Sequence, residues 1–460
     1  MKQYYIDGKG TIEKLFRITI DEEFTLCIRY LAIAINGIRI WTVIMGGREY
    51  MQITVNQHYV PRFYMKHFAN VKNIEQDNEK ALISFYQFKD NMLKENIPTK
   101  TVCSEDFFYD RDGRIEKSLA NKENKWSRAI QNALDSQITM DDEESIREFV
   151  VYQICRTKAM LDHNREMVTS IMQGTLNQKF GDMANEEDIK KHLENKIQNE
   201  ITPEFCLSIV KEIIPVIRDL NMKIITNETE VKFITSDVPV IIMNPLGIDN
   251  AGLDMIGEVI FFPISPQKII VFYDAKIFDI VPDKIYDESV IEVFNYYQYI
   301  SADERLLAKE LATLNYIANN EELNSKREQF HQRKKTDTVE NGIGSFFAAK
   351  SRSIPYYYNI SVFRLPRSLR KIPNEFRETF PREYSNITRI SILCRIYKSP
   401  DFIHSAEEKK YWKKRQEYSK IILYYLDNYW NTPKNDRTIT PELMYKLKTV
   451  PVNTFRINQS

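Results

Sequence analysis

The spacing of hydrophobic residues changes along the chain, and the change divides it into regions. Over residues 115–219, apolar residues recur at three- and four-residue intervals, which is typical of amphipathic helices. Residues 222–275 contain short β-branched and aromatic runs bounded by Asn, Asp, Gly and Pro, which predict an antiparallel sheet. A helical pattern returns over residues 287–335. We predict helices in the first region at about 115–134, 143–160 continuing toward 172, 186–199 and 203–219.

Together these patterns predict an α+β protein. Before the first long helix, we expect a short strand or an extended lead-in at 53–59 and a strand at 81–88. A basic, aromatic-rich extension follows the core at residues 341–460. The predicted core, 51–335, has three parts, which are a mostly helical layer over 57–220, the sheet over 222–275 and further helices over 287–335.

The first fifty residues contain an apolar stretch and a possible translation signal. Phe24–Met45 is apolar but contains two arginines, each of which costs roughly 2.5–3.5 kcal/mol at the centre of a bilayer, so no membrane span is expected. Residues 46–48, Gly-Gly-Arg, can be encoded by a ribosome-binding sequence a few codons before Met51. We therefore expect translation to start at Met51 and residues 1–50 to be non-native or mis-assigned.

Glycine and cysteine usage excludes some classes of protein. The chain has 13 glycines and neither GxGxxG nor GxxxxGK[ST], which argues against a dinucleotide-binding fold and a P-loop NTPase. Its five cysteines lie far apart without a CxxC pair, so we expect reduced, mostly buried thiols in a cytoplasmic protein.

Charge is unevenly distributed. The whole chain carries 64 Lys+Arg and 64 Asp+Glu, but residues 341–460 carry 22 Lys+Arg against 10 Asp+Glu, a net of +12. Residues 345–460 also contain 20 aromatic residues. Basic groups neutralise phosphates and rings stack on unpaired bases, so nucleic acid is an expected partner of this region. Alternatively, the rings are buried and the charge docks the region onto the acidic remainder.

Two carboxylates and an arginine are candidates for a polar site. Glu123 falls on the apolar face of the predicted helix 115–134, and Glu116 lies seven residues earlier, so both project to roughly one side. A carboxylate on an inward face must be paired or bound to metal. Arg156 borders the apolar face of the next helix. It can pair with Glu123 in an internal salt bridge, or it can hold a phosphate or another anion.

Further candidates come from the segments TSDVPV and QHYVPRFY. Ser236 and Asp237 end a predicted strand at a corner made rigid by Pro239. Asp237 either contributes to metal or acid–base chemistry or caps a turn through backbone N–H groups. His58 precedes a helix start, where the helix dipole favours a neutral imidazole, and Arg62 follows it.

Several separated segments carry a family resemblance. They are QHYVPRFYMKHFAN, CSEDFFYD, QICRTK, KFITSDVPVIIMNP and FFPISPQKIIVFYD. In order and spacing the chain resembles, over about residues 56–318, a bacterial domain-of-unknown-function family with an HYVPxFYLxxF opening and later FxTSDNPV and FPLSP segments. Val238 stands where that family usually has Asn, and Lys158 where it often has Pro. The resemblance implies no activity.

Two functional hypotheses follow. The first is a metal-dependent phosphodiesterase or nuclease-like hydrolase with a role in host defence, in which Mg²⁺ or Mn²⁺ is held by Glu123 and Asp237. Its catalytic residues would be His58, Glu116, Glu123, Arg156 and Asp237, with Arg62 and Ser236 in substrate binding. The second is a non-catalytic nucleic-acid or protein binding module, in which the same polar residues form structural pairs and the basic region contacts nucleic acid.

Overall fold

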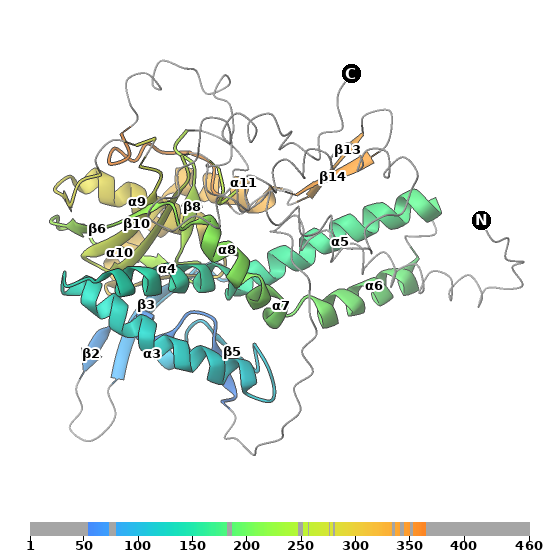
Figure 1. Cartoon of the computed structure of the whole chain (residues 1–460), viewed down its shortest axis with the longest axis horizontal. Helices are drawn as coiled ribbons and strands as arrows, with labels where there is room; N and C mark the ends of the chain where they lie inside the picture. The colour runs from blue at the N-terminus through green and yellow to red at the C-terminus, as the bar shows by residue number, and fades with distance from the viewer. Residues whose placement is uncertain are drawn as a thin grey trace, which may run out of the picture. The chain divides into compact units, whose positions relative to one another are not determined.

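The computed structural model contains both helices and antiparallel strands, which confirms the α+β class (Figure 1). Residues 1–50 and 365–460 lie outside the described residues, so the predictions made for them stay predictions. The structure describes residues 54–72, 80–181, 186–246, 252–255, 257–275, 277–278, 281–333, 336–340, 345–349 and 353–364. Within these ranges, no helix is both long enough and apolar enough to cross a bilayer.

The sheet predicted over residues 222–275 is present, with one added edge strand. Its strands are β6 (Asn221–Asn227), β8 (Ile241–Met243), β9 (Val259–Ser265), β10 (Lys268–Tyr273) and β11 (Lys284–Ile285). They are ordered β11-β6-β10-β9-β8 and pair antiparallel except for β11 with β6. All seven residues of β9 are buried, because this strand is covered on both faces.

A second five-stranded sheet adjoins the first. Its strands are β2 (Asn70–Lys72), β3 (Lys80–Gln87), β4 (Met92–Pro98), β7 (Thr235–Ser236) and β12 (Arg305–Ala308). They are ordered β2-β3-β12-β7, and β4 also pairs with β3. The strand β12 lies inside the stretch predicted as helices, and at four residues it is too short for a period-2 pattern to predict. Because β7 and β8 belong to different sheets, residues 237–240 carry the chain from one sheet to the other.

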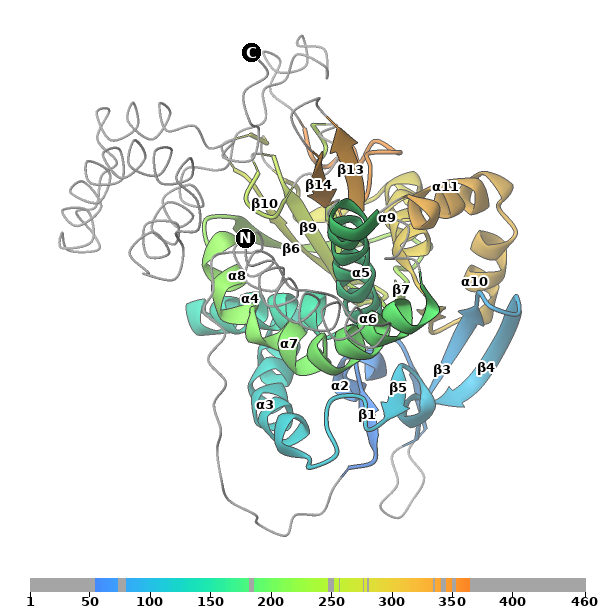
Figure 2. The ribbon, with the colours of Figure 1, turned by 90° about the vertical axis from the view of Figure 1, so that its right-hand side faces the viewer.

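Helices pack against both sheets. Their bounds are α2 (Arg62–Lys66), α3 (Arg114–Leu134), α4 (Met140–Cys155), α5 (Lys158–Phe180), α6 (Glu187–Glu200), α7 (Pro203–Ser208), α8 (Val210–Val216), α9 (Glu288–Ser301), α10 (Leu311–Ala318) and α11 (Glu321–Gln332). Two pairs of short strands lie outside the sheets, β1 (Asn56–His58) with β5 (Ser104–Asp106) and β13 (Thr336–Glu340) with β14 (Ser345–Ala349). In both views α5 and α6 run side by side (Figures 1 and 2).

Neighbouring aromatic residues of β9 face opposite sides of the sheet, as strand geometry requires. Phe261 meets Phe294 of α9 edge to face, with 5.0 Å between ring centroids. Phe262 stacks on Tyr64 of α2 at 4.8 Å and meets Phe149 of α4 at 5.6 Å. The core therefore continues through the sheet and joins α9 on one face to α2 and α4 on the other.

The helix predicted from 143 through 172 is broken in the structure. It ends at Cys155, and α5 begins at Lys158. The side chain of Thr157 accepts a hydrogen bond from the backbone N–H of Met160 at 3.2 Å, which makes Thr157 the N-cap of α5. Apolar spacing does not reveal this cap. The break leaves Arg156 at the corner between the two helices.

The packing on β9 predicts a large cost for removing one of its rings. Phe262→Ala should lower the free energy of unfolding in urea by about 3–5 kcal/mol, because a buried ring is lost and a cavity is left. Tyr286→Ala is the matched control, since Tyr286 is 73% exposed, and it should change the free energy by less than about 0.5 kcal/mol. Equal effects of the two substitutions would contradict this packing.

Candidate functional site

Arg156 is the centre of a polar cluster at the corner between α4 and α5. The residue is only 2% exposed. Its guanidinium donates three hydrogen bonds, from Nη1 to Glu123 Oε1 at 2.8 Å, from Nη2 to the carbonyl oxygen of His58 at 2.8 Å and from Nε to Tyr109 Oη at 2.9 Å. The predicted pairing of Arg156 with Glu123 is confirmed. These three acceptors offset the cost of burying the charge.

A buried glutamine aligns the acceptors of this arginine. Gln57 lies in β1, next to His58, and is fully buried. Its Oε1 accepts from the backbone N–H groups of Tyr109 (2.7 Å) and Asp110 (3.2 Å), and its Nε2 donates to the Asp110 carbonyl at 2.8 Å. The loop after β5 is thereby fixed on β1. Sequence reasoning missed Gln57 and Tyr109, although both stand in the quoted segments QHYVP and CSEDFFYD.

Glu116 is the second carboxylate of the Arg156 cluster. Its pKa is raised to about 7, mainly by burial; the positive charge of Arg156 opposes the rise, and the negative charges of Glu123 and Asp110 contribute to it. Its Oε2 is buried and accepts no hydrogen bond from the described residues. Near neutral pH this carboxyl is therefore present in both protonated and ionised forms.

His58 contributes both its carbonyl oxygen and its ring. Burial lowers the pKa of the ring to about 4, and the positive charges of Arg62 and Arg156 lower it as well, against hydrogen bonding to the backbone of Thr99 and Lys100. The neutral imidazole expected from the helix dipole thus has desolvation as its main cause. Nε2 of the ring is buried without a hydrogen bond to the described residues. Arg62 is exposed.

Asp237 belongs to a second cluster, at the corner between the two sheets. Its carboxylate accepts hydrogen bonds from the backbone N–H groups of Asp303 (3.0 Å) and Glu304 (2.6 Å). Its own N–H donates to the Arg305 carbonyl at 3.1 Å. Burial raises the pKa of Asp237 to about 7, the negative charge of Asp303 adds to the rise, and the two N–H donors oppose it. Of the two predicted roles, this geometry provides the capping of backbone N–H groups.

Ser236 supports the same corner. Its Oγ donates to Gln298 Oε1 of α9 at 2.9 Å and accepts from the Val238 N–H at 3.1 Å. Nε2 of Gln298 donates in turn to the Pro239 carbonyl at 2.8 Å. The polar residues of TSDVPV therefore fasten the crossing between the sheets to α9.

Lys158 forms ion pairs with one residue near each of the two polar clusters. Its Nζ lies 2.6 Å from Glu105 Oε1 in β5 and 2.8 Å from Glu304 Oε1 beside the Asp237 turn. The pKa of Lys158 is raised, since these hydrogen bonds and charges outweigh desolvation. Lys158 therefore takes part in two ion pairs at once.

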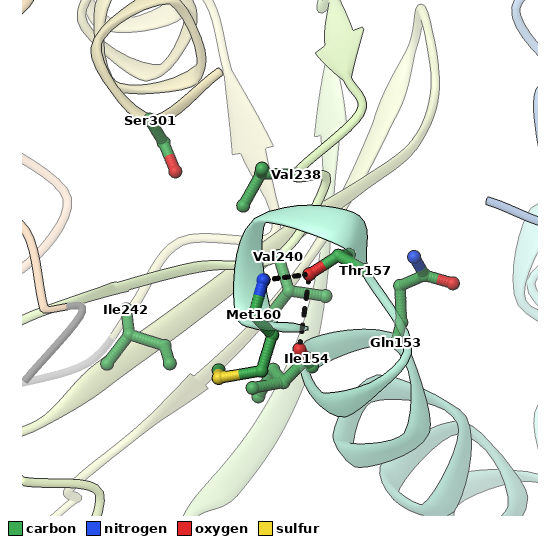
Figure 3. A pocket seen from close by; sticks show the side chains of 8 residues that line it. All are labelled: Gln153, Ile154, Thr157, Met160, Val238, Val240, Ile242 and Ser301. Carbon is green, nitrogen blue, oxygen red and sulfur yellow. Dashed lines mark hydrogen bonds between the residues drawn. The ribbon is translucent and has the colours of Figure 1, made fainter. Parts of the chain in front are cut away.

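Val238 lines a small cavity between the α4–α5 corner and the sheet crossing. Figure 3 shows Gln153, Thr157 and Met160 around this cavity with Val238 and Val240. Its volume is about 20 Å³, which is room for one water molecule. Among the described residues, no group of three His, Cys, Asp or Glu side chains is placed to hold a metal ion. Glu123 and Asp237 thus lie in separate hydrogen-bonded clusters.

The raised pKa of Glu116 predicts a pH-dependent effect of Glu116→Gln. A carboxyl whose pKa is higher in the folded state destabilises the fold as pH rises from about 4.5 through about 7. The variant should therefore gain stability relative to the parent chain, by roughly 1–2 kcal/mol more at pH 8 than at pH 5 after allowance for solvent screening.

The quantity to compare is the difference in the free energy of unfolding in urea between the variant and the parent chain. The difference is needed because the lowered pKa of His58 changes the stability with pH in the opposite direction. His58 gains stability as pH rises toward about 6.5, and this contribution is common to both chains. Glu95→Gln, at an exposed position, serves as the control and should give the same difference at both pH values. A pH-independent effect of Glu116→Gln would contradict the assignment.

Residues 56–310 match the family model described as "Protein of unknown function (DUF4238)". The match covers more than half of the 460 residues, so the chain belongs to this family, and the resemblance found in the sequence is confirmed. Both polar clusters lie inside the matched range. Neither a curated protein nor a solved structure matches the chain.

Proposed function

We propose that this member of the family is a non-catalytic nucleic-acid-binding protein of the cytoplasm, in which the polar clusters of the family domain are structural. The observation that carries the proposal is that all three nitrogens of the Arg156 guanidinium are engaged. All three of its hydrogen bonds run to groups of the chain itself, which leaves it poorly suited to hold a substrate anion.

The environment of Asp237 supports the same proposal. Two backbone N–H groups occupy its carboxylate, and the cavity at its corner has a volume of only about 20 Å³. A nucleotide or phosphodiester requires several hundred Å³ of space. The three buried cysteines of the described chain, Cys103, Cys155 and Cys206, are free thiols, which suits a reducing compartment.

The nucleic-acid partner is proposed from the charge of residues 341–460. A net of +12 interleaved with aromatic residues suits phosphate neutralisation combined with base stacking. The densest basic run is KKYWKKR at residues 409–415. In this proposal the family domain serves as a rigid support, and the basic region makes the contacts.

The salt dependence of binding tests this proposal on the full chain. Changing the five basic residues of 409–415 to Ala should weaken binding of a single-stranded oligonucleotide by at least tenfold at low salt. It should also reduce the slope of log K against log salt by up to about 3.5, because each phosphate contact on a single strand contributes about 0.7. Fluorescence anisotropy at four or more salt concentrations measures both quantities.

A matched control separates specific contacts from net charge. It removes the same number of positive charges from exposed positions of the described domain, Lys89, Lys100, Lys125, Lys191 and Lys211. This variant should keep the slope of the parent chain to within about 1. Equal losses in the two variants, or no binding by the parent chain, would refute the proposal.

A metal-dependent phosphodiesterase or nuclease-like hydrolase remains the second candidate. It is favoured by one observation, which is that Glu116 Oε2 and His58 Nε2 are buried polar atoms without hydrogen bonds to the described residues. A carboxyl with a pKa of about 7 and a neutral imidazole, both acted on by the charge of Arg156, suit proton transfer. Degradation of RNA or DNA with Mg²⁺ or Mn²⁺, lost in Glu116→Gln with folding intact, would establish this candidate against the binding protein.

A further inference from the structure

A second cavity borders the turn whose N–H groups bind Asp237. It has a volume of about 590 Å³ and is formed by the β3–β4 hairpin and helices α9, α10 and α11. The hairpin and α10 lie side by side (Figure 2). This volume falls within the range of about 300–1,000 Å³ that is usual for small-molecule sites. All of α10 and α11 follow the family match, which ends at residue 310.

A fixed guanidinium forms part of the wall. Nη2 of Arg327 donates to the carbonyl oxygens of Ala302 (3.0 Å) and Asp303 (2.8 Å), and the guanidinium lies over the ring of Phe88, 3.6 Å from its centroid. Phe88 is itself held edge to face by Tyr86 and Tyr299. No carboxylate of the described chain forms a salt bridge with Arg327, and its Nε is buried without a hydrogen bond. The positive charge is therefore held in place without a salt bridge, and the carboxylates of Asp237 and Asp303 act on it through space.

Two asparagine amides are oriented by tyrosine hydroxyls. Tyr86 Oη donates to Asn91 Oδ1 at 2.7 Å, and Tyr299 Oη donates to Asn324 Oδ1. Because the amide oxygens are engaged as acceptors, the amide nitrogens remain as donors. Asn91 Nδ2 has no partner among the described residues, and Asn324 Nδ2 has only a contact of 3.5 Å to the Ala318 carbonyl.

Acceptors are also present but are fewer. The exposed carboxylate of Glu328 and the amide of Asn319 line the same cavity, and they can accept hydrogen bonds from hydroxyl groups. A ligand that satisfies this arrangement needs an oxyanion for the donors and Arg327, and hydroxyl groups for the acceptors. The aromatic walls suit its apolar surfaces.

We propose that this cavity binds a small organic anion that carries a phosphate or carboxylate group together with hydroxyl groups. The geometry behind the proposal is that Arg327, Asn91 and Asn324 together line one cavity of ligand size. It is independent of nucleic-acid binding by the basic region. Phosphate and carboxylate ligands share this recognition chemistry, and the experiment distinguishes them.

Isothermal titration of the full chain with four probes tests the proposal. The probes are adenosine monophosphate, adenosine, citrate and inorganic phosphate, each up to millimolar concentration. Saturable binding of adenosine monophosphate and not of citrate identifies a phosphate ligand, and the reverse identifies a carboxylate ligand. Either result supports the proposal. Absence of saturable binding by every probe, or equal binding of adenosine and its monophosphate, would overturn it.

Two matched variants locate the binding. Asn91 and Asn96 both adopt positive φ angles, 54° and 56°, and both are exposed, but only Asn91 lines the cavity. Asn91→Asp replaces a donor by a negative charge and should weaken binding of the anionic probe at least tenfold, whereas Asn96→Asp should leave it within twofold. If Asn91→Asp fails to fold, Asn315→Asp in α10 gives the same test. Equal affinities of the cavity variant and Asn96→Asp would overturn the proposal.

Discussion

The burial of one guanidinium constrains the family domain. A charge that is 2% exposed must be surrounded by acceptors, and Arg156 takes them from segments 33, 47 and 98 residues away along the chain. The helix break at Thr157, the β1–β5 pairing and the loop fixed by Gln57 bring those acceptors to it. Removing any one of them would leave a buried charge with too few hydrogen bonds, which is costlier than never burying it.

The second cluster also surrounds a buried charge with hydrogen-bonding groups, but here the charge is negative. Asp237 is buried where the chain crosses between two sheets, and backbone N–H groups of the α9–β12 turn bind it. Lys158 then ties that turn to β5 by two ion pairs. The perturbed pKa values of Glu116, His58 and Asp237 all have burial as their first cause, and such values occur in structural networks as well as in active sites. The features suited to ligands are a cavity of about 590 Å³, whose Arg327 donates to the Asp303 carbonyl of the second cluster, and the basic region.

Sequence periodicity predicted those features of the fold that depend only on the spacing of neighbouring residues. The apolar face of α3 with Glu123 on it, and Arg156 beside the face of α4, were enough to predict their ion pair. Periodicity could not predict β12, whose four residues pair with strands more than 60 residues away, or the helix break, which depends on one Thr157 side chain. The partners of Asp237 are backbone groups that have no sequence signature. The cavity is assembled from a hairpin and three distant helices, so no single segment indicates it.

A double-mutant cycle between Arg156 and Glu123 tests the structural role of the cluster most directly. The free energy of urea unfolding is measured for Arg156→Met, Glu123→Gln, the double variant and the parent chain. If the pair supports the fold, the two substitutions should be non-additive, with a coupling energy of about 1–3 kcal/mol and each single variant less stable than the parent. Additivity within about 0.5 kcal/mol would contradict the account.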